Sequence, residues 1–305
     1  MKATVFGGSG FLGSHVADAL TRAGYETTIF DIRKSPYLQQ GQEMIVGNII
    51  DKMTVEKAIR GRDVVYNFAG LADIEEAHNK PIETVENNIL GTTIILESCR
   101  QNKVKRFVFA STIYVYSDVG SFYRSSKQAC ELIIENYREV YNLAYTILRY
   151  GSLYGPRSDE RNYMYRILKQ AITEDRITSF GKGDDLREYI HVLDAAQYSV
   201  EILSQEFENQ RVIITGAQAM KRVELLTMIK EMPGNRIEID FRPVNSELHY
   251  DITPYSFSPK IARVYRGDSY LDLGQGILQC LEEIYQKYSP DQKPGGLSTA
   301  NSDKK

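Results

Sequence analysis

Short apolar runs alternate with longer amphipathic segments through the first half of the chain. The apolar runs predict strands at 3–6, 27–30, 43–46, 63–68, 106–110 and 144–150. Between them, apolar residues recur with helical spacing, at 14–23, 54–60, 82–102 and 125–141. Strands that alternate with helices in this way are typical of a parallel sheet covered by helices on both faces. The pattern therefore predicts a doubly wound α/β fold of the Rossmann type.

The alternation breaks at Gly155-Pro156, and the helix predicted over 163–175 need not pack on the sheet. Two strand-like runs follow, at 188–192 and 211–215, and we expect both to return to the sheet. A helix at 223–232 and a strand at 236–241 come next. We therefore predict a Rossmann domain formed by 1–152 and about 183–217, and a smaller, discontinuous C-terminal lobe formed by about 153–182 and 218–288. The tail 289–305, rich in Pro, Gly, Ser and Lys, is expected to be disordered.

The composition argues against several classes of protein. The 305 residues carry a net charge of −3 with no basic stripe, which argues against a nucleic-acid partner. No apolar stretch approaches the ~20 residues that a membrane span needs, and no signal peptide precedes the first strand. Cys99, Cys130 and Cys280 show no metal-ligand spacing, and neither do the histidines. We expect a cytoplasmic protein with reduced thiols, no metal and no membrane partner.

Three glycines, Gly7, Gly10 and Gly13, separate the first strand from the first helix. Glycine lets the backbone turn sharply and come close to a pyrophosphate, and the helix N-terminus offers free N–H groups to the anion. The next strand ends in Asp31, where a carboxylate can accept hydrogen bonds from ribose hydroxyls. This arrangement predicts a dinucleotide site. Asp31 favours NAD over NADP because a carboxylate repels a 2′-phosphate, although Arg33 and Lys34 weaken that argument.

A second candidate is the pair Tyr123 and Lys127, four residues apart and therefore on one helix face. A phenol is a poor base at neutral pH, and a neighbouring ammonium favours the phenolate. An isolated pair at this spacing is more often a surface contact, but this one follows a predicted strand that ends in Ser111-Thr112, facing the crevice where such sheets bind ligands. We expect Tyr123 to take a proton from a hydroxyl, with support from Lys127. Thr112 is expected to hydrogen-bond the reacting oxygen, and capping of the strand end by Ser111 or Thr112 is the structural alternative.

With these motifs the chain resembles the extended short-chain dehydrogenase/reductases of the sugar-nucleotide epimerase/dehydratase group, from residue 1 to about 285. The family's glycine motif, acidic residue and Tyr-x-x-x-Lys fall on the residues already named. Further matches are Asn67-Phe68-Ala69-Gly70, Asn88 before Gly91-Thr92, Thr112 before Val115-Tyr116, Arg149 to Pro156, and Arg187 to Asp194. The adenine-contacting Asp-Leu pair of the family falls on Asn48-Ile49, with asparagine in place of aspartate.

The resemblance implies an NAD-dependent enzyme that acts on a nucleotide-diphosphate sugar. The cofactor-binding residues that it implies are Gly7, Ser9, Gly10, Phe11, Leu12, Gly13, Asp31, Ile32, Arg33, Asn48, Ile49, Phe68, Ala69, Gly70, Asn88, Ser111, Tyr123, Lys127 and Tyr150. The implied substrate-binding residues are Leu71, Thr112, Tyr114, Ser152, Arg187 and Arg263. In the family the arginine matching Arg187 reaches the sugar diphosphate, whose oxygens suit a guanidinium fork. An ion pair of Arg187 with Glu188 or Asp185 is the structural alternative.

Departures from the family narrow the reaction. The acid and base of the 4,6-dehydratases, the glutamate of the decarboxylases and the cysteine of relatives that epimerise beside a ketone fall on Ile113 or Tyr114, which cannot replace them. What remains is hydride chemistry at C4. The leading prediction is a sugar-nucleotide 4-epimerase. The alternatives are a 4-dehydrogenase or 4-ketoreductase on the same substrate class, and a dinucleotide-sensing protein without catalysis.

Two further expectations concern size and assembly. Only about ten residues separate Thr112 from Tyr123, where relatives carry a longer loop, so we expect an open sugar pocket suited to a larger sugar such as a heptose. The helices predicted around 82–100 and 125–141 carry apolar residues beyond one face. In the family such helices pair across a two-fold axis into a four-helix bundle, so we expect a homodimer.

Overall fold

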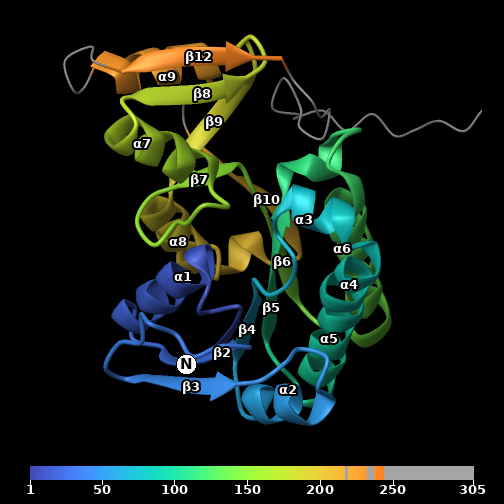
Figure 1. Ribbon diagram of the computed structural model, residues 1–305. Coiled ribbons are helices and arrows are strands. Elements are labelled where there is room, and N and C mark those ends of the chain that lie inside the picture. Colours follow the sequence, from blue (N-terminus) through green and yellow to red (C-terminus); the bar gives the residue numbers. More distant parts are fainter. Residues whose placement is uncertain (217–218, 232–236, 244–305) are drawn as a thin grey trace, which may run out of the picture. The chain divides into compact units, whose positions relative to one another are not determined.

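The computed structural model describes residues 1–216, 219–231 and 237–243. Its main feature is a seven-stranded parallel sheet in the order β10-β6-β5-β4-β1-β2-β3 (Figure 1). The strands are β1 (Lys2–Phe6), β2 (Glu26–Asp31), β3 (Gln42–Val46), β4 (Val64–Asn67), β5 (Arg106–Thr112), β6 (Tyr145–Tyr150) and β10 (Gln210–Ile214). Because β10 pairs with β6, the run predicted at 211–215 does return to this sheet.

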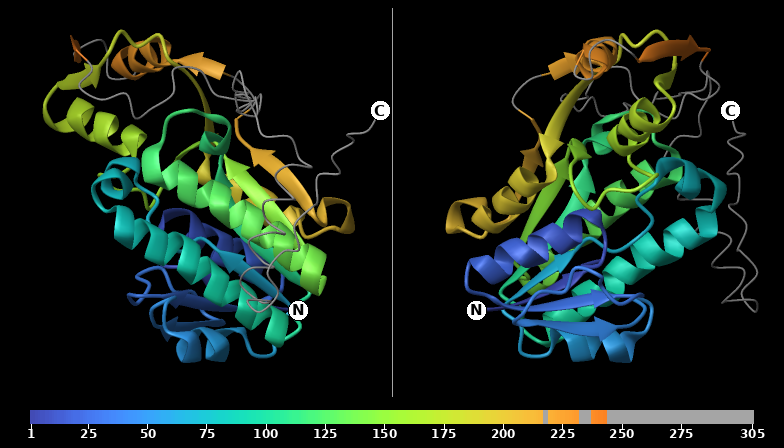
Figure 2. Two further views of the ribbon diagram at one scale, coloured as in Figure 1. Left: turned by 90° about the vertical axis from the view of Figure 1, so that its right-hand side faces the viewer. Right: turned by 60° about the vertical axis from the view of Figure 1, so that its left-hand side comes forward.

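Helices cover both faces of the sheet because its strands carry apolar residues on both sides. On one face, Val5, Ile29 and Val108 pack with α1 (Phe11–Arg22) and α8 (Val192–Glu201). On the other face, Phe6, Phe30 and Phe109 pack with α2 (Lys52–Ile59), α5 (Gly91–Gln101) and α6 (Ser121–Tyr141). The views of Figure 2 show α5 and α6 running side by side. The doubly wound, Rossmann-type sheet predicted from the pattern is confirmed.

The segment predicted as one helix over 82–102 is divided in the structure. Two short helices, α3 (Ile74–Asn79) and α4 (Pro81–Thr84), precede a π-helical turn over Val85–Leu90, and α5 follows it. A π turn holds more residues than an α turn, and such turns are frequent at functional sites. Here the π turn places Asn88 in the interior, where only 2% of the residue is exposed.

Two smaller sheets follow in the chain. In the first, β9 (Leu186–His191) pairs in parallel with β7 (Ser152–Tyr154) and antiparallel with β11 (Ala219–Lys221). In the second, β8 (Arg176–Phe180) pairs with β12 (Glu238–Arg242), and both pack near α7 (Tyr163–Thr173) and α9 (Arg222–Glu231) around an apolar cluster of their own.

One expectation for this region is wrong. The run at 188–192 does not return to the main sheet, because β9 pairs with β7, which follows β6 directly in the chain, and β10 takes the place beside β6. The division of the chain into a domain and a lobe at the predicted boundaries stays a prediction. The tail 289–305 and Cys280 lie outside the described residues, whereas Cys99 and Cys130 are buried free thiols.

Candidate active site

The turn between β1 and α1 is closed by glycines that leave no room for side chains. Gly7 has a φ of +75°, and a Cβ there would lie 2.7 Å from backbone atoms of Phe68 and Ala69. A Cβ on Gly13 would lie 2.3 Å from the Gly7 carbonyl oxygen, so α1 packs directly on the turn. Helix α1 begins at Phe11, and no side chain caps its N-terminus. Its first N–H groups are therefore available to an anion, as the pyrophosphate of a dinucleotide requires.

Asp31, at the end of β2, lies beside this turn. Its carboxylate accepts hydrogen bonds from the N–H of Ser9 at 3.0 Å and the N–H of Arg33 at 3.3 Å. The Ser9 hydroxyl donates to the Arg33 carbonyl at 2.9 Å. These bonds tie the turn after β1 to the turn after β2. The structure thus brings Asp31 to the glycine turn, with Ile32 and Arg33 exposed next to it.

The turn after β3 places Asn48 and Ile49 differently. Asn48 is exposed, and its side-chain oxygen accepts the N–H of Ile50 at 3.1 Å. Ile49 is 6% exposed and packs on Gly91, where a Cβ would lie 2.5 Å from the Ile49 side chain. Of this pair, Asn48 is therefore the one with a side chain open to a ligand.

Asn88 joins three segments from inside the π turn. Its Oδ1 accepts the N–H of Leu71 at 2.7 Å, and its Nδ2 donates to the Leu71 carbonyl at 3.0 Å and to the Ser126 hydroxyl at 2.9 Å. Gly70 has a φ of +131°, and a Cβ there would lie 2.4 Å from Asn88 Oδ1. The loop after β4 is thereby fixed to α6, the helix that carries Tyr123 and Lys127.

Lys127 is buried, with 6% of the residue exposed, one turn after Tyr123 on α6. Its Nζ donates to the Ala110 carbonyl at 2.8 Å and lies 5.8 Å from the centre of the Tyr123 ring. Burial lowers the pKa of Lys127, because an ammonium is less favourable away from water. Tyr123 itself is half-buried, and its ring meets the Tyr114 ring edge-on with centres 6.4 Å apart.

Thr112 is the last residue of β5, two residues after Ala110. Its hydroxyl accepts the N–H of Tyr114 at 3.2 Å and so caps the 3-10 turn Ile113–Tyr116. Thr112 therefore caps the turn that follows the strand, close to the strand-end capping considered above, and its hydroxyl can still donate its own hydrogen to a ligand oxygen. Tyr123, Lys127 and the end of β5 are brought together as their spacing predicts.

A buried ion pair behind these residues was not predicted as part of the site. Glu131, 5% exposed, accepts the Ser111 hydroxyl at 2.5 Å and makes a two-point contact with Arg149 at 3.1 and 2.5 Å. Arg149 also donates to the Tyr116 hydroxyl and lies 4.7 Å from the centre of that ring. The network joins α6, β5, β6 and the 3-10 turn. The sequence signals its parts separately: Ser111 and Arg149 fall within the family matches, and the spacing of four residues from Lys127 to Glu131 places both on one helix face.

Tyr150 lies in the core. It is 5% exposed, its hydroxyl shares a 2.6 Å hydrogen bond with the Ser199 hydroxyl, and its ring centre is 6.4 Å from that of Phe68. Burial raises the pKa of Tyr150, so the phenol stays protonated. Tyr150 supports Phe68 from the sheet, and its direct contact with a cofactor stays a prediction.

The predicted substrate residues beyond the main sheet lie on the three-stranded sheet. Ser152 pairs with Tyr189, and Arg187 precedes Tyr189 by two residues, so these side chains share one face. Asp185 contacts Arg187 at 3.4 Å and Arg222 at 2.8 Å. The ion pair with Asp185, the structural alternative for Arg187, is thus present. Arg263 lies outside the described residues.

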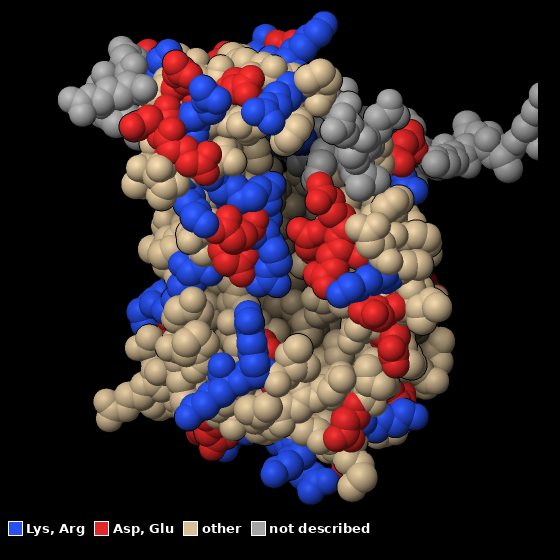
Figure 3. Space-filling model, viewed as in Figure 1, with Lys and Arg blue, Asp and Glu red and all other residues tan. Residues whose placement is uncertain are grey.

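The face shown in Figure 3 is hollowed at its centre; Lys and Arg side chains prevail on one side of the hollow, around a group of Asp and Glu side chains, and Asp and Glu side chains prevail on the other. A basic wall suits an anionic ligand. Among the described residues, no three His, Cys, Asp or Glu side chains are grouped to hold a metal ion. Within the same part of the chain, no helix is both long and apolar enough to span a bilayer.

Comparison with known proteins agrees with this geometry. The chain is 29% identical over 253 residues to the UDP-N-acetyl-alpha-D-glucosaminuronate decarboxylase of Bacillus cytotoxicus, covering 73% of this chain and 77% of that protein. It is 31% identical over 240 residues to the UDP-glucose 4-epimerase of Yersinia pestis, covering 64% and 71%. The crystal structure of Thermus thermophilus UDP-glucose 4-epimerase in complex with NAD matches with a TM-score of 0.77 at 26% identity, over 86% of this chain and 95% of that one. The profile of the NAD dependent epimerase/dehydratase family matches residues 3–216, and the chain belongs to this family.

Proposed function

We propose that this protein catalyses NAD-dependent oxidation and reduction at C4 of a nucleotide-linked sugar, as a 4-epimerase. The observation that carries the proposal is the buried Lys127 ammonium beside the Tyr123 ring, at the end of β5. Burying an ammonium that has no carboxylate in hydrogen-bond contact among the described residues costs stability, and groups whose pKa burial shifts are common at functional sites. A tyrosine and a lysine at the same spacing on the surface would not lower stability in this way, because the ammonium would stay in water.

Each residue has a separate task in this proposal. Tyr123 takes the proton of the C4 hydroxyl and returns a proton when the hydroxyl is restored. The Lys127 ammonium favours the Tyr123 phenolate by its charge and holds a ribose hydroxyl of the cofactor. Thr112 donates a hydrogen bond to the reacting oxygen. NAD, when bound, supplies the hydride acceptor.

The residues around the main sheet fit the cofactor. The glycine turn has no space for a Cβ but is open to a pyrophosphate at the uncapped start of α1. Asp31 is held in place to accept ribose hydroxyls, and Asn48 is exposed at the next strand end. The loop Phe68–Leu71, fixed by Asn88, completes the cofactor side.

The substrate side is proposed to take a nucleotide diphosphate. Arg187 offers a guanidinium for phosphate oxygens, and Ser152, Leu71 and Tyr114 border the sugar. The two curated relatives described above carry UDP-sugar names, which makes UDP-linked sugars the first substrates to test. The short segment between Thr112 and Tyr123 leaves room for a sugar as large as a heptose.

The alternatives differ in what happens after the hydride leaves the sugar. A 4-dehydrogenase or 4-ketoreductase would release its reduced or oxidised cofactor, whereas an epimerase reuses it. The similarity to a decarboxylase does not favour decarboxylation, because the glutamate of that group falls on Tyr114. Ile113, 1% exposed, has neither an acid nor a thiol to offer. A sensor without catalysis has no use for Thr112, Tyr123 and Lys127 together.

A screen of nucleotide sugars tests the proposal, with products read by mass spectrometry and proton NMR. An epimerase changes configuration at constant mass, and a dehydrogenase removes two hydrogens. Tyr123→Phe should lower turnover by about 10³-fold, the scale of a lost general base, while NADH still binds. Tyr165→Phe, on the exposed side of α7, is the matched control. Indifference of the wild-type protein and of Tyr123→Phe to every sugar, with NADH bound, would favour the sensor.

We also propose a homodimer through the outer face of the π turn and α6. Val85, Leu90, Leu132 and Val140 are 49%, 46%, 63% and 68% exposed, so this face offers apolar side chains to a partner. Leu132→Glu should convert a dimer into a monomer in light scattering. Ile172→Glu on α7, where the side chain is 81% exposed, should not. A monomeric wild-type protein contradicts the proposal.

A further inference from the structure

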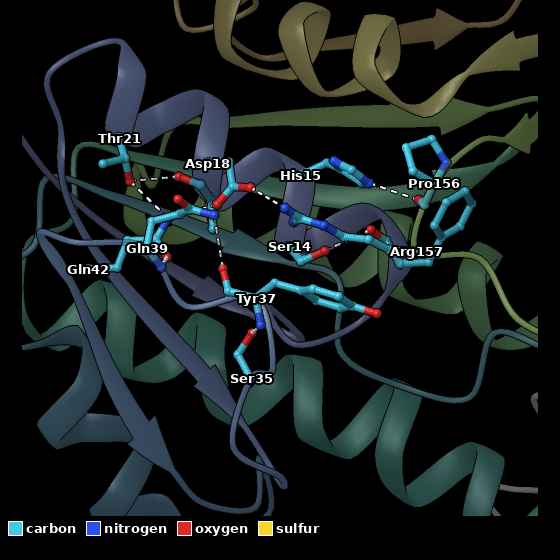
Figure 4. Close-up of polar contacts among 12 residues, drawn as sticks. Ser14, His15, Asp18, Thr21, Ser35, Tyr37, Gln39, Gln42, Pro156 and Arg157 are labelled. Atoms are coloured by element: carbon cyan, nitrogen blue, oxygen red, sulfur yellow. Dashed lines mark hydrogen bonds and ion pairs between the residues drawn. The ribbon is translucent and has the colours of Figure 1, made fainter.

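A cluster of polar contacts lies outside the residues assigned above, between α1 and the segment that follows β7 (Figure 4). Arg157 donates from Nη2 to Asp18 at 2.7 Å, and its guanidinium lies 4.5 Å from the centre of the Tyr37 ring. Next to it, Nε2 of His15 lies 2.9 Å from the Pro156 carbonyl. A carbonyl only accepts, so the imidazole donates here. We call these three contacts the Arg157 clasp.

Two side chains of the Arg157 clasp, His15 and Asp18, are buried. Asp18 is 7% exposed, and its second oxygen accepts Nε2 of Gln42 at 3.0 Å, which fixes the carboxylate from both sides. The Arg157 side chain is 19% exposed, and its Nη1 is buried without an acceptor among the described residues. Burial lowers the pKa of His15, so the ring is neutral when it donates to Pro156. A carboxylate left alone at such a site is costly, so Asp18 and Arg157 depend on each other.

The backbone at Arg157 also needs these contacts. Its φ is +66°, in the left-handed region that a residue with a side chain rarely adopts. Such a conformation persists where the surroundings impose it, and it is common at ligand clamps. Here the surroundings are Asp18 on one side and Tyr37 on the other.

The two partners of Arg157 belong to the cofactor side, and its own segment belongs to the substrate side. Asp18 lies on α1, whose first turn is the proposed pyrophosphate site, and Tyr37 lies in the loop that follows Asp31. Arg157 comes three residues after β7, the strand of Ser152. Tyr154, at the end of β7, packs edge-on against His191 of β9, the strand of Arg187.

We propose that Arg157 is a positioning residue that couples cofactor binding to the order of the substrate segment, 152–158. NAD that holds α1 and the loop after Asp31 also holds Asp18 and Tyr37, and through them Arg157 and the end of β7. This inference rests on the proposed function for the meaning of Ser152, but the coupling itself does not depend on which sugar binds. Linkage makes the coupling reciprocal: the factor by which NADH raises the affinity of the substrate segment for a ligand is the factor by which that ligand raises the affinity for NADH.

Hydrogen exchange tests the coupling without any sugar. In the wild-type protein, NADH should slow amide exchange about tenfold in peptides from the glycine turn and also in peptides covering 152–158. In Arg157→Met, NADH should still protect the glycine turn but no longer 152–158. Arg161→Met is the matched control, since Arg161 pairs with Asp159 directly after this segment, and it should keep both protections. Persistence of the 152–158 protection in Arg157→Met overturns the proposal.

A second variant separates coupling from stability. Arg157→Met leaves Asp18 unpaired and lowers the melting temperature, whereas the double variant Asp18→Asn with Arg157→Met removes the buried charge and should restore much of it. The proposal requires that the coupling stay lost in the double variant. Recovery of the 152–158 protection together with stability would show a structural role only, and would overturn it.

A binding measurement separates this proposal from the function. With UDP-glucose as the probe, wild-type NADH affinity should rise about fivefold, and Arg157→Met should abolish that rise. If no nucleotide sugar is turned over but the exchange results hold, the proposed function fails and the coupling stands. If sugars are turned over while Arg157→Met keeps the protection of 152–158, the function stands and the coupling is wrong.

Discussion

The cofactor side and the substrate side of the candidate site are built differently. The glycine turn and Asp31 follow the carboxyl ends of strands of the seven-stranded sheet, Asn88 lies on the π turn, and all are held by close packing and hydrogen bonds. Ser152 and Arg187 are partly exposed on a three-stranded sheet whose strand β7 has 3 residues. The first region tolerates few substitutions, because a side chain added at Gly7 or Gly13 would clash with backbone atoms. In the second region Arg187 is held by an ion pair with Asp185, a contact between side chains and not with the backbone.

The largest expected effect on ligand binding is on the cofactor side, for Gly13→Ala. A Cβ placed 2.3 Å from the Gly7 carbonyl forces α1 away from the turn, so NADH affinity should fall by at least about 100-fold. NADH fluorescence measures it, and the chain has no tryptophan to interfere. Gly24→Ala is the control: φ is +84° there but a Cβ meets nothing within 4 Å, so stability should fall and NADH affinity should not. Equal NADH affinities for both variants would contradict the role given to the close packing of Gly13 on the turn.

Next in size is Lys127, which links the cofactor side to the proposed chemistry. Lys127→Met should weaken NADH binding about 30-fold, through loss of a charge-assisted hydrogen bond. Because burial lowers the pKa of Lys127 below its ordinary 10.5, wild-type NADH affinity should fall as the pH rises through that lowered pKa. In Lys127→Met this pH dependence should disappear.

In the same pH range the stability of the wild-type protein should rise with pH, whereas its NADH affinity should fall. Above the lowered pKa the unfolded chain binds the Lys127 proton and the folded protein does not, so this group stabilises the fold as the pH rises toward 10.5. A loss of NADH binding in that pH range would therefore not be due to unfolding caused by deprotonation of Lys127. An NADH affinity that is flat up to pH 10.5 contradicts the role given to the ammonium.

A smaller effect is expected on the substrate side, for Arg187→Lys. Lysine keeps the charge but loses the planar fork, so affinity for UDP-glucose should fall about tenfold while NADH affinity stays the same. Titration calorimetry with each ligand separates the two, and exposed Arg242→Lys is the control. If NADH affinity falls as well, the two sides of the site are not separate.

The smallest expected effect is for Asp31→Asn. The amide can still accept one hydrogen bond but no longer repels a 2′-phosphate, so the preference for NAD over NADP should fall by about fivefold. Competition of NAD and NADP against bound NADH gives the ratio. An unchanged ratio would mean that the charge of Asp31, which accepts the N–H of Arg33, does not set the preference for NAD. Another group would then distinguish NAD from NADP.

Some of the site follows from short stretches of sequence. Gly7 to Gly13 and Asp31 occupy the ends of adjacent strands, and Tyr123 and Lys127 share a helix face, because strand, turn and helix geometry act over a few residues. The parallel sheet follows from the alternation of apolar runs for the same reason. The expectation that 188–192 joins that sheet failed because an apolar run states that a strand is buried, not which strand it pairs with.

By itself the sequence determined the doubly wound sheet, the glycine turn and the Tyr123–Lys127 spacing. Only the tertiary structure decided that Asn88 enters the interior on a π turn, that Glu131 joins Ser111 to Arg149, and that Arg157 reaches Asp18. These contacts join segments up to 139 positions apart in the chain. Their partners are set by how helices and sheets pack, which no local periodicity records.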